Sequence, residues 1–477
     1  MRRSNPEAFE RFDNQKKRKT MPKATATDPA RVVKQLVSYI TAAPKRRLPP
    51  RVAERAKHHL LDTLSAMLSG SRLLPGQRAI QYARDQGGNA EACVIGSDVL
   101  TSATTAALAN GMHGHSDETD DTDYLSLVHP GCSIVPAALA MAERTKSGGE
   151  ALLRAVVVGY DMCARLSQAL GIEKFRTYGH SSHSFGGMLG SGVAAGALAG
   201  LDAAGVRNVL SYTAQQLSGL SCWARDVQHV QKAFHFGGMP ARNGVTAAIM
   251  AQMGFTGVDD TLEGERGFFQ AFREFIEPSK LVADLGRVYE IENTSIKRWA
   301  VGYPIQAPLD AVSNIIERHA VTGGNVERVL ITIDDQGART VNQRKMASIN
   351  IQHLVAIMLL DGEITFASAH DEQRVEDPAV LRMRKRIELQ GSAALGRAKT
   401  TQAVVEIATR DGRRLRHHTT AVLGTAANPM SREQVAAKSR DLLVPVIGAR
   451  RTENLIKAVW EIEQLKDVRK LQRLLML

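Results

Sequence analysis

The sequence predicts a mainly α protein, in which a large all-helical domain is discontinuous in the chain and a smaller α+β domain forms a lid. Apolar residues recur at helical spacing through most of the first 290 residues. The pattern then changes to β-type alternation and becomes helical again from Ser431. Only 5% of the 477 residues are aromatic, whereas Ala and Gly are abundant, which suits closely packed helices.

The helical pattern begins at Asp28. One apolar stripe has the spacing i, i+3, i+4 and i+7 at Val33, Leu36, Val37 and Ile40. A second stripe runs from Leu60 to Leu68, and Gly70 is typical of a helix C-terminus. Further helical patterns cover residues 101–111, 134–146, 149–170, 185–199, 203–219 and 243–253.

Strand patterns appear after residue 290. Val326–Ile333 and residues 384–389 are typical strands, and residues 349–360 between them are helical in pattern. Residues 400–409 and 413–422 alternate on either side of Arg410-Asp411-Gly412, which indicates a β-hairpin. Residues 452–465 and 466–475 are again helical. The expected division is a disordered basic tail (1–28), a helical domain (29–290 and 426–477) and an α+β domain (291–425), with Met21 as a candidate natural start.

Composition excludes several classes of protein. The four cysteines form no CxxC pair, so we expect small core residues and no disulfide framework. The sequence contains neither a run of about 18 apolar residues, as a membrane span would need, nor an apolar leader, as secretion would need. A cytoplasmic location is therefore expected. Residues 1–30 and 381–418 carry +4 and +7 of the net charge of +12. Such local patches are typical of solvated surfaces or of a field that attracts small polyanions, and no nucleic-acid-binding module accompanies them.

Four polar clusters lie beside the apolar helices. They span residues 113–131, 178–183, 232–238 and 297–306, and each contains Gly together with His or Lys. A metal-dependent hydrolase that uses His113, His115, Asp120 and His183 is one interpretation. The acidic run from Asp117 to Asp123 is also compatible with a solvated loop. A third interpretation is metal-free acid/base catalysis, since imidazole titrates near neutral pH and Lys232 can hold a substrate carboxylate.

Taken together, five segments resemble the MmgE/PrpD family. They are LLDTLSAMLSG (60–70), HSDETDDT with HPG (115–131), GHSSHSFGG (179–187), QKAFHFGGMPARNG (231–244) and KRWAVGYPIQAPLDA (297–311). The resemblance runs from about residue 30 to the C-terminus, with the motifs in the family's order. It implies a helical domain with an α+β lid and an active site between them. It also implies lyase or epimerase chemistry without a metal or organic cofactor, and a homodimer.

The resemblance also implies site residues. The catalytic residues would be His129, His180, Lys232, Glu118 and Thr122, with Glu118 where the family motif has Asp. Substrate-binding residues would be Lys232, Tyr303 and Lys297, and no residue would bind metal. The expected function is a cofactor-independent lyase for a small di- or tricarboxylate, of the 2-methylcitrate dehydratase type. Decarboxylation of the cis-aconitate type, epimerisation, metal-dependent hydrolysis and a non-catalytic binding role remain alternatives.

Overall fold

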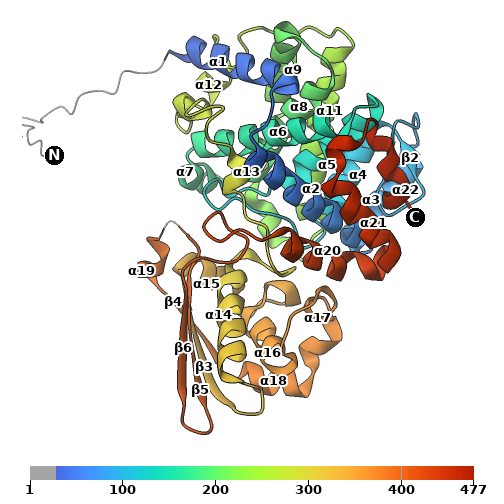
Figure 1. Ribbon diagram of the computed structural model, residues 1–477. Coiled ribbons are helices and arrows are strands. Elements are labelled where there is room, and N and C mark those ends of the chain that lie inside the picture. Colours follow the sequence, from blue (N-terminus) through green and yellow to red (C-terminus); the bar gives the residue numbers. More distant parts are fainter. Residues whose placement is uncertain (1–27, 399) are drawn as a thin grey trace, which may run out of the picture.

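Helices build most of the structure, which confirms the mainly α prediction (Figure 1). The computed structural model describes residues 28–398 and 400–477. The predicted tail up to residue 27, with Met21, therefore lies outside the described residues. Asp28 caps the first helix, because its side chain accepts a hydrogen bond from the Ala30 amide at 3.1 Å. The second helix ends at Gly70, as the sequence predicts.

The larger part, here called the helical body, contains both ends of the described chain. Its N-terminal helices surround α6 and α8, and α20 and α21 return to pack beside α2 (Figure 1). The helices are α1 (Pro29–Ala42), α2 (Pro50–Gly70), α3 (Leu74–Gln86), α4 (Ala103–Gly114), α5 (Gly131–Arg144), α6 (Gly149–Ala169), α7 (Ile172–Thr177), α8 (Ser182–Leu198), α9 (Ala203–Gln216), α10 (Val230–Ala233), α11 (Met239–Gln252), α12 (Phe268–Ala271), α13 (Glu290–Asn293), α20 (Arg432–Ile447), α21 (Ala449–Trp460) and α22 (Gln472–Leu475). A short antiparallel pair, β1 (Ala92–Cys93) and β2 (Leu100–Thr101), was not predicted.

The smaller part, here called the α+β part, runs from α14 to β6. Its four strands have the order β4-β3-β5-β6, with β3 parallel to β4 and antiparallel to β5. The hairpin predicted around Asp411-Gly412 is confirmed, since β5 pairs with β6 in the register Ile407↔Leu415. The elements are α14 (Tyr303–His319), β3 (Val326–Ile333), α15 (Asp335–Val341), α16 (Ile351–Asp361), α17 (Phe366–Ala369), α18 (Pro378–Arg384), β4 (Ile387–Gly391), α19 (Ala393–Gly396), β5 (Ala403–Thr409) and β6 (Arg414–Thr419).

The two parts have separate hydrophobic cores. One core of the helical body joins residues from Val52–Ile296 to residues from Met430–Leu475, and a second packs α1 against α6, α8 and α9. The core of the α+β part takes its residues from Trp299 to Val422. We propose that the domain boundaries lie near residues 291 and 425, and these cores support that division.

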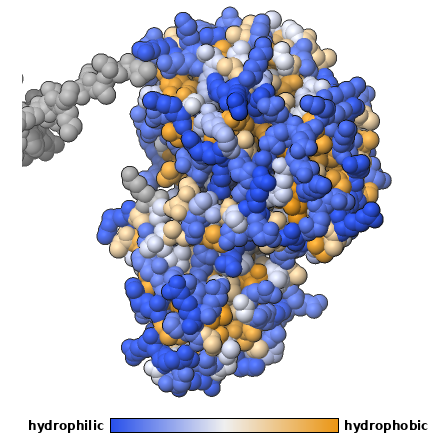
Figure 2. Space-filling view, in the orientation of Figure 1, coloured by the Kyte–Doolittle hydropathy of each residue, from blue (hydrophilic) through white to orange (hydrophobic). Residues whose placement is uncertain are grey.

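The visible face of the molecule is mostly hydrophilic, with small apolar groups and a constriction between the two parts (Figure 2). None of the helices in the described residues is long and apolar enough to cross a membrane. All four cysteines are free thiols. Cys93, Cys132 and Cys163 are buried as expected, but Cys222 is exposed, so the expectation of four core residues was wrong for this one.

Glycines allow the central helices to pack with their backbones in contact. A Cβ atom on Gly190 of α8 would lie 2.6 Å from the carbonyl oxygen of Gly159 in α6. A Cβ atom on Gly244 of α11 would lie 2.4 Å from the amide nitrogen of Gly192 in α8. The abundance of small residues in the sequence therefore reflects helix contacts that no larger side chain fits.

We predict that Gly244→Ala lowers the free energy of unfolding by about 1–3 kcal/mol, because the added methyl group forces α11 away from α8. The midpoint of thermal unfolding measures this change. Gly324→Ala is the matched control, since its Cβ atom would meet only the Thr322 hydroxyl at 3.8 Å. Equal melting temperatures for Gly244→Ala and the wild type would contradict the close packing.

Candidate active site

The acidic run between α4 and α5 is buried. We call residues 117–123 the carboxylate loop, and all seven of them are at most 6% exposed. The alternative of a solvated loop is therefore wrong. Because a buried carboxylate is costly without a partner, each one in the loop needs its own hydrogen bonds or cations. The partners come from segments far apart in the chain.

Asp121 binds the loop to the interior of the helical body. It accepts hydrogen bonds from His59 Nδ1 at 2.7 Å, the Tyr160 hydroxyl at 2.6 Å and the Gly131 amide at 2.9 Å. Gly131 is the first residue of α5 and follows His129-Pro130. Asp121 therefore fixes the junction that carries His129.

Asp120 faces the opposite way and joins two imidazoles. Its Oδ2 atom lies 2.9 Å from His115 Nδ1, and its Oδ1 atom lies 3.2 Å from His129 Nδ1. Lys297 Nζ is 3.6 Å from the same Oδ1 atom. Burial raises the pKa of Asp120, but these neighbours outweigh it and hold the pKa well below its usual range. Because Asp120 binds Nδ1 of His129, Nε2 is the nitrogen that this ring offers to a ligand.

Glu118 lies between two lysines. Lys232 Nζ donates to Glu118 Oε1, and Lys297 Nζ donates to the Glu118 carbonyl oxygen at 2.7 Å. Burial raises the pKa of Glu118, but the charges of Lys232 and Lys297 hold it well below its usual range. The side chains of Lys232 and Glu118 are only 14% and 8% exposed, so their charges act in a low-dielectric environment.

Residues 229–238 place Lys232 and an aromatic wall against the loop. His229 has a left-handed backbone (φ 62°) and precedes α10, and Phe234–Gly238 forms a π-helical turn. Gly237 in this turn touches α4, since a Cβ atom there would lie 1.9 Å from the Gly111 carbonyl oxygen. This close approach brings Phe236 to the end of α4. The Phe236 ring stacks on His115 (centroids 4.3 Å apart) and on His183 (3.9 Å).

Four imidazoles in this region have pKa values below the usual range, so they are neutral near pH 7. Burial lowers the pKa of His115 and of His235 to about 4 in each case. Burial also lowers the pKa of His183, with a further contribution from His129, and that of His229, with a contribution from Lys232. The site therefore combines neutral imidazoles, two lysines and two ionised carboxylates.

Gln306 fixes the segment that carries Lys297. Its side chain accepts hydrogen bonds from the amides of Arg298 and Trp299 and donates to the carbonyl oxygens of Trp299 and Val301. The buried Gln306 side chain thus supplies hydrogen bonds to the backbone between Lys297 and α14, which has no regular secondary structure. Lys297 is 1% exposed and fully engaged by the carboxylate loop.

The structure brings together four of the residues expected in the site: His129, Lys232, Glu118 and Lys297. Thr122 lies in the loop, but its contacts are structural, since its backbone pairs with Ser295. The centroid of the Tyr303 ring lies 6.2 Å from that of Tyr124, the residue that follows the carboxylate loop.

The structure does not place His180 in this cluster. The His180 ring stacks on Phe175 at 4.6 Å and packs against Phe272 and Phe275 instead. His183 lies beside His129, with ring centroids 5.5 Å apart. His183 is in the first turn of α8, whereas His180 precedes the helix in a short bridge to Leu220.

The four residues considered for a metal-dependent hydrolase do not form one ligand set. His113 points away from the site and contacts the Gly76 carbonyl oxygen at 3.2 Å. Within the described part of the chain, two other groups come close enough to share a cation: His115, Asp120 and Cys132, and His115, Glu118 and His229. Both groups include a carboxylate that is already paired with a cation or an imidazole.

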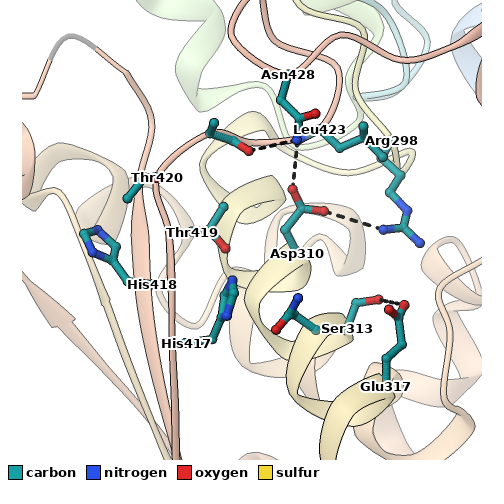
Figure 3. A pocket seen from close by; sticks show the side chains of 12 residues that line it. Arg298, Asp310, Ser313, Glu317, His417, His418, Thr419, Thr420, Leu423 and Asn428 are labelled. Carbon is teal, nitrogen blue, oxygen red and sulfur yellow. Dashed lines mark hydrogen bonds and ion pairs between the residues drawn. The ribbon is translucent and has the colours of Figure 1, made fainter.

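A solvent cavity of about 390 Å³ lies elsewhere, between α14 and the end of β6 (Figure 3). Asp310 on its wall accepts a hydrogen bond from the Leu423 amide at 2.9 Å and lies 3.6 Å from Arg298. His417, from the basic stretch 381–418, also lines it. None of the residues lining this cavity belongs to the cluster around His129.

Several residues of the site were not predicted. His229, Trp223 and Phe236 flank the predicted Lys232 in sequence, and their proximity to it was the available signal. His59, Tyr160, His370 and Lys438 contact the loop from distant helices, and no sequence motif marks them.

Comparisons with known proteins identify the family of this chain. Models of the MmgE/PrpD N-terminal and C-terminal domains match residues 34–278 and 299–462. The chain is 27% identical over 446 residues to a cis-aconitate decarboxylase of Homo sapiens, with 90% of this chain and 91% of the relative covered. It is 23% identical over 460 residues to a cis-aconitate decarboxylase of Aspergillus terreus, with 90% and 92% covered. The two family models together cover most of the sequence, and the chain therefore belongs to the MmgE/PrpD family.

Proposed function

We propose that the protein is a cofactor-independent lyase for a small polycarboxylate, and that it decarboxylates a tricarboxylate of the cis-aconitate type. The observation that carries this proposal is the buried Lys232–Glu118 pair next to the His129–Asp120 pair. A cation that can hold a carboxylate thus lies beside an imidazole that can move a proton. Relatives that span the whole of this arrangement are named cis-aconitate decarboxylases, which supports the choice of reaction.

The reaction needs few groups. In cis-aconitate, the bond between the CH₂ carbon and its carboxylate breaks, and CO₂ leaves. The electron pair of that bond forms a new C=C bond, and the pair of the original C=C bond takes a proton. The enzyme must therefore hold the two remaining carboxylates and supply one proton at carbon. Negative charge that develops on the substrate is stabilised most by fixed cations in a dry site.

His129 is the proposed proton donor, because Asp120 orients its ring through Nδ1 and leaves Nε2 for the substrate. Lys232 is the proposed carboxylate ligand. Its Nζ atom lies 5.1 Å from the Phe236 ring centroid and 5.4 Å from that of Trp223, so these rings cover part of the ammonium group. A substrate carboxylate would compete with Glu118 for Lys232. Lys297 would contribute its charge through the loop.

Dehydration of the 2-methylcitrate type is the second candidate. It requires removal of a proton next to a carboxylate and protonation of the leaving hydroxyl group, so it needs two acid/base groups. The adjacent rings of His129 and His183 provide such a pair. Epimerisation of a dicarboxylate would use the same two rings.

We predict that the purified protein converts cis-aconitate to 2-methylenesuccinate and CO₂, and that the reaction survives exhaustive chelation. NMR of reaction mixtures with cis-aconitate, 2-methylcitrate, citrate and iminodisuccinate, with and without chelator, measures this. Turnover of 2-methylcitrate alone would favour the dehydratase. Activity that is lost on chelation and restored by one metal would contradict the cofactor-independent mechanism.

We predict that His129→Ala lowers kcat about 10²–10⁴-fold with the fold intact, because it removes the proton donor. His183→Ala should lower kcat less. His180→Ala tests the assignment implied by family resemblance, and we expect near wild-type kcat because its ring packs among phenylalanines. Steady-state kinetics with thermal melts compare the three variants. An inactive His180→Ala alongside an active His183→Ala would reverse their assignment.

We predict that Lys232→Ala raises KM and lowers kcat together, because it removes a carboxylate ligand from both the ground state and the transition state. Glu118→Gln should keep KM closer to the wild type, since Lys232 then remains available to the substrate. Lys280→Ala, which breaks an exposed ion pair with Glu277, is the control. An unchanged KM in Lys232→Ala would remove Lys232 from substrate binding.

A further inference from the structure

The two neighbours of Glu118 in the carboxylate loop are held by residues from the C-terminal half of the chain. The Asp117 carboxylate lies 2.9 Å from Nε2 of His370, in the α+β part. The Thr119 carbonyl oxygen accepts a hydrogen bond from Lys438 Nζ at 2.9 Å, and Lys438 belongs to α20 of the helical body. Glu118 therefore sits between two anchors that come from opposite sides of the junction between the parts.

His370 is well placed to act as an anchor. It follows the last residue of α17, where its Nδ1 atom lies 2.9 Å from the Phe366 carbonyl oxygen. The other ring nitrogen is thereby directed to Asp117. The Asp117 carboxylate forms an ion pair with the protonated His370 ring. It accepts hydrogen bonds from the amide and the hydroxyl group of Thr119, at 3.0 and 2.6 Å. Through these contacts the position of α17 is linked to the backbone on both sides of Glu118.

Helix α20 contacts both the carboxylate loop and α17, and it lies next to α17 at the junction (Figure 1). Asp441 of α20 accepts a hydrogen bond from the Phe366 amide at 2.7 Å, so it holds the start of α17. One turn earlier, Lys438 donates to Asp62 Oδ1 at 2.6 Å as well as to Thr119. Asp62 and Lys438 are both almost fully buried, which makes this a rigid attachment point.

We propose that His370 and Lys438 are positioning residues of the lyase site, which hold the carboxylate loop beside His129 and Lys232 by fixing Asp117 and Thr119 from the α+β part and from α20. The inference rests on the proposed function and extends it to the coupling between the two parts. Neither residue contacts Lys232 or His129 directly. Their effect on turnover passes through the loop, whose geometry must be held closely because small displacements in an active site are costly.

The test compares His370→Ala, His370→Gln, Asp117→Asn and the double variant His370→Ala/Asp117→Asn. We expect His370→Ala to lower kcat/KM about 10- to 100-fold. His370→Gln should recover part of this loss, because its amide can still donate to Asp117. The double variant should be no worse than the worse single variant, since both changes remove the same contact. His418→Ala, which breaks an exposed contact with Gln402, should behave as the wild type.

Amide hydrogen exchange gives a readout that does not depend on the substrate. We expect faster exchange in residues 115–123 of His370→Ala and unchanged exchange in α6 and α8 of the central core. Lys438→Met should have the same local effect, and Lys438→Met/Asp62→Asn serves if the single variant is unstable because of the unpaired Asp62. The exposed Lys457→Met is the control.

The outcomes separate this inference from the proposed function. If the wild type converts none of the acids tested, the proposed function fails, and exchange in residues 115–123 then decides the anchoring by itself. If the wild type is active and His370→Ala changes neither kcat/KM nor exchange in this segment, the inference is wrong. A uniform rise in exchange throughout the protein would also contradict it, since that would indicate a general structural role.

Discussion

The burial of five carboxylates within seven residues is the constraint on which the site depends. Asp117, Glu118, Asp120, Asp121 and Asp123 occupy one loop between α4 and α5 and are shielded from water. An unpaired buried carboxylate costs several kcal/mol or becomes protonated, so the fold must bring a partner to each one. Asp123 has the fewest partners, and burial raises its pKa to about 6. The partners of the other four carboxylates come from segments throughout the chain.

The two sides of the carboxylate loop have different partners. Asp121 points into the helical body and is saturated by His59, Tyr160 and the start of α5. Asp120, one residue earlier, points to His115 and His129. Because these adjacent residues have partners on opposite sides, the loop can anchor itself on one side and orient imidazoles on the other. Glu118, two residues before Asp120, contacts the lysines.

Much of the fold could be predicted from local patterns. The apolar stripe that ends at Gly70, strand 326–333 and the Asp-Gly hairpin each have a sequence pattern within a few residues, and the structure has them at or near the predicted positions. The choice between His180 and His183 could not be made in this way. His183 lies in the first turn of α8, whereas His180 precedes the helix in a bridge to Leu220, so the path of the chain before the helix decides where the His180 ring points.

The residues that anchor the loop could not be predicted from the sequence, for a different reason. His59, His370 and Lys438 lie 62, 253 and 319 residues from their partners Asp121, Asp117 and Thr119, and a single sequence contains no signal for such pairs. The π-helical turn that presents Phe236 depends on the contact between Gly237 and Gly111, which is also tertiary. Motifs therefore marked several residues of the proposed site, whereas their distant contacts became visible only in the structure.

The most direct test is a crystal structure of the protein with propane-1,2,3-tricarboxylate, a saturated analogue that cannot lose CO₂ by the proposed route. We expect one carboxylate of the analogue on Lys232, in place of Glu118, and its carbon chain within reach of His129 Nε2. The carboxylate loop should keep its contacts with His59, Tyr160 and Lys438. Binding of the analogue at the cavity beside Arg298 and His417, with the Lys232–Glu118 pair intact, would contradict the proposed site (Figure 3).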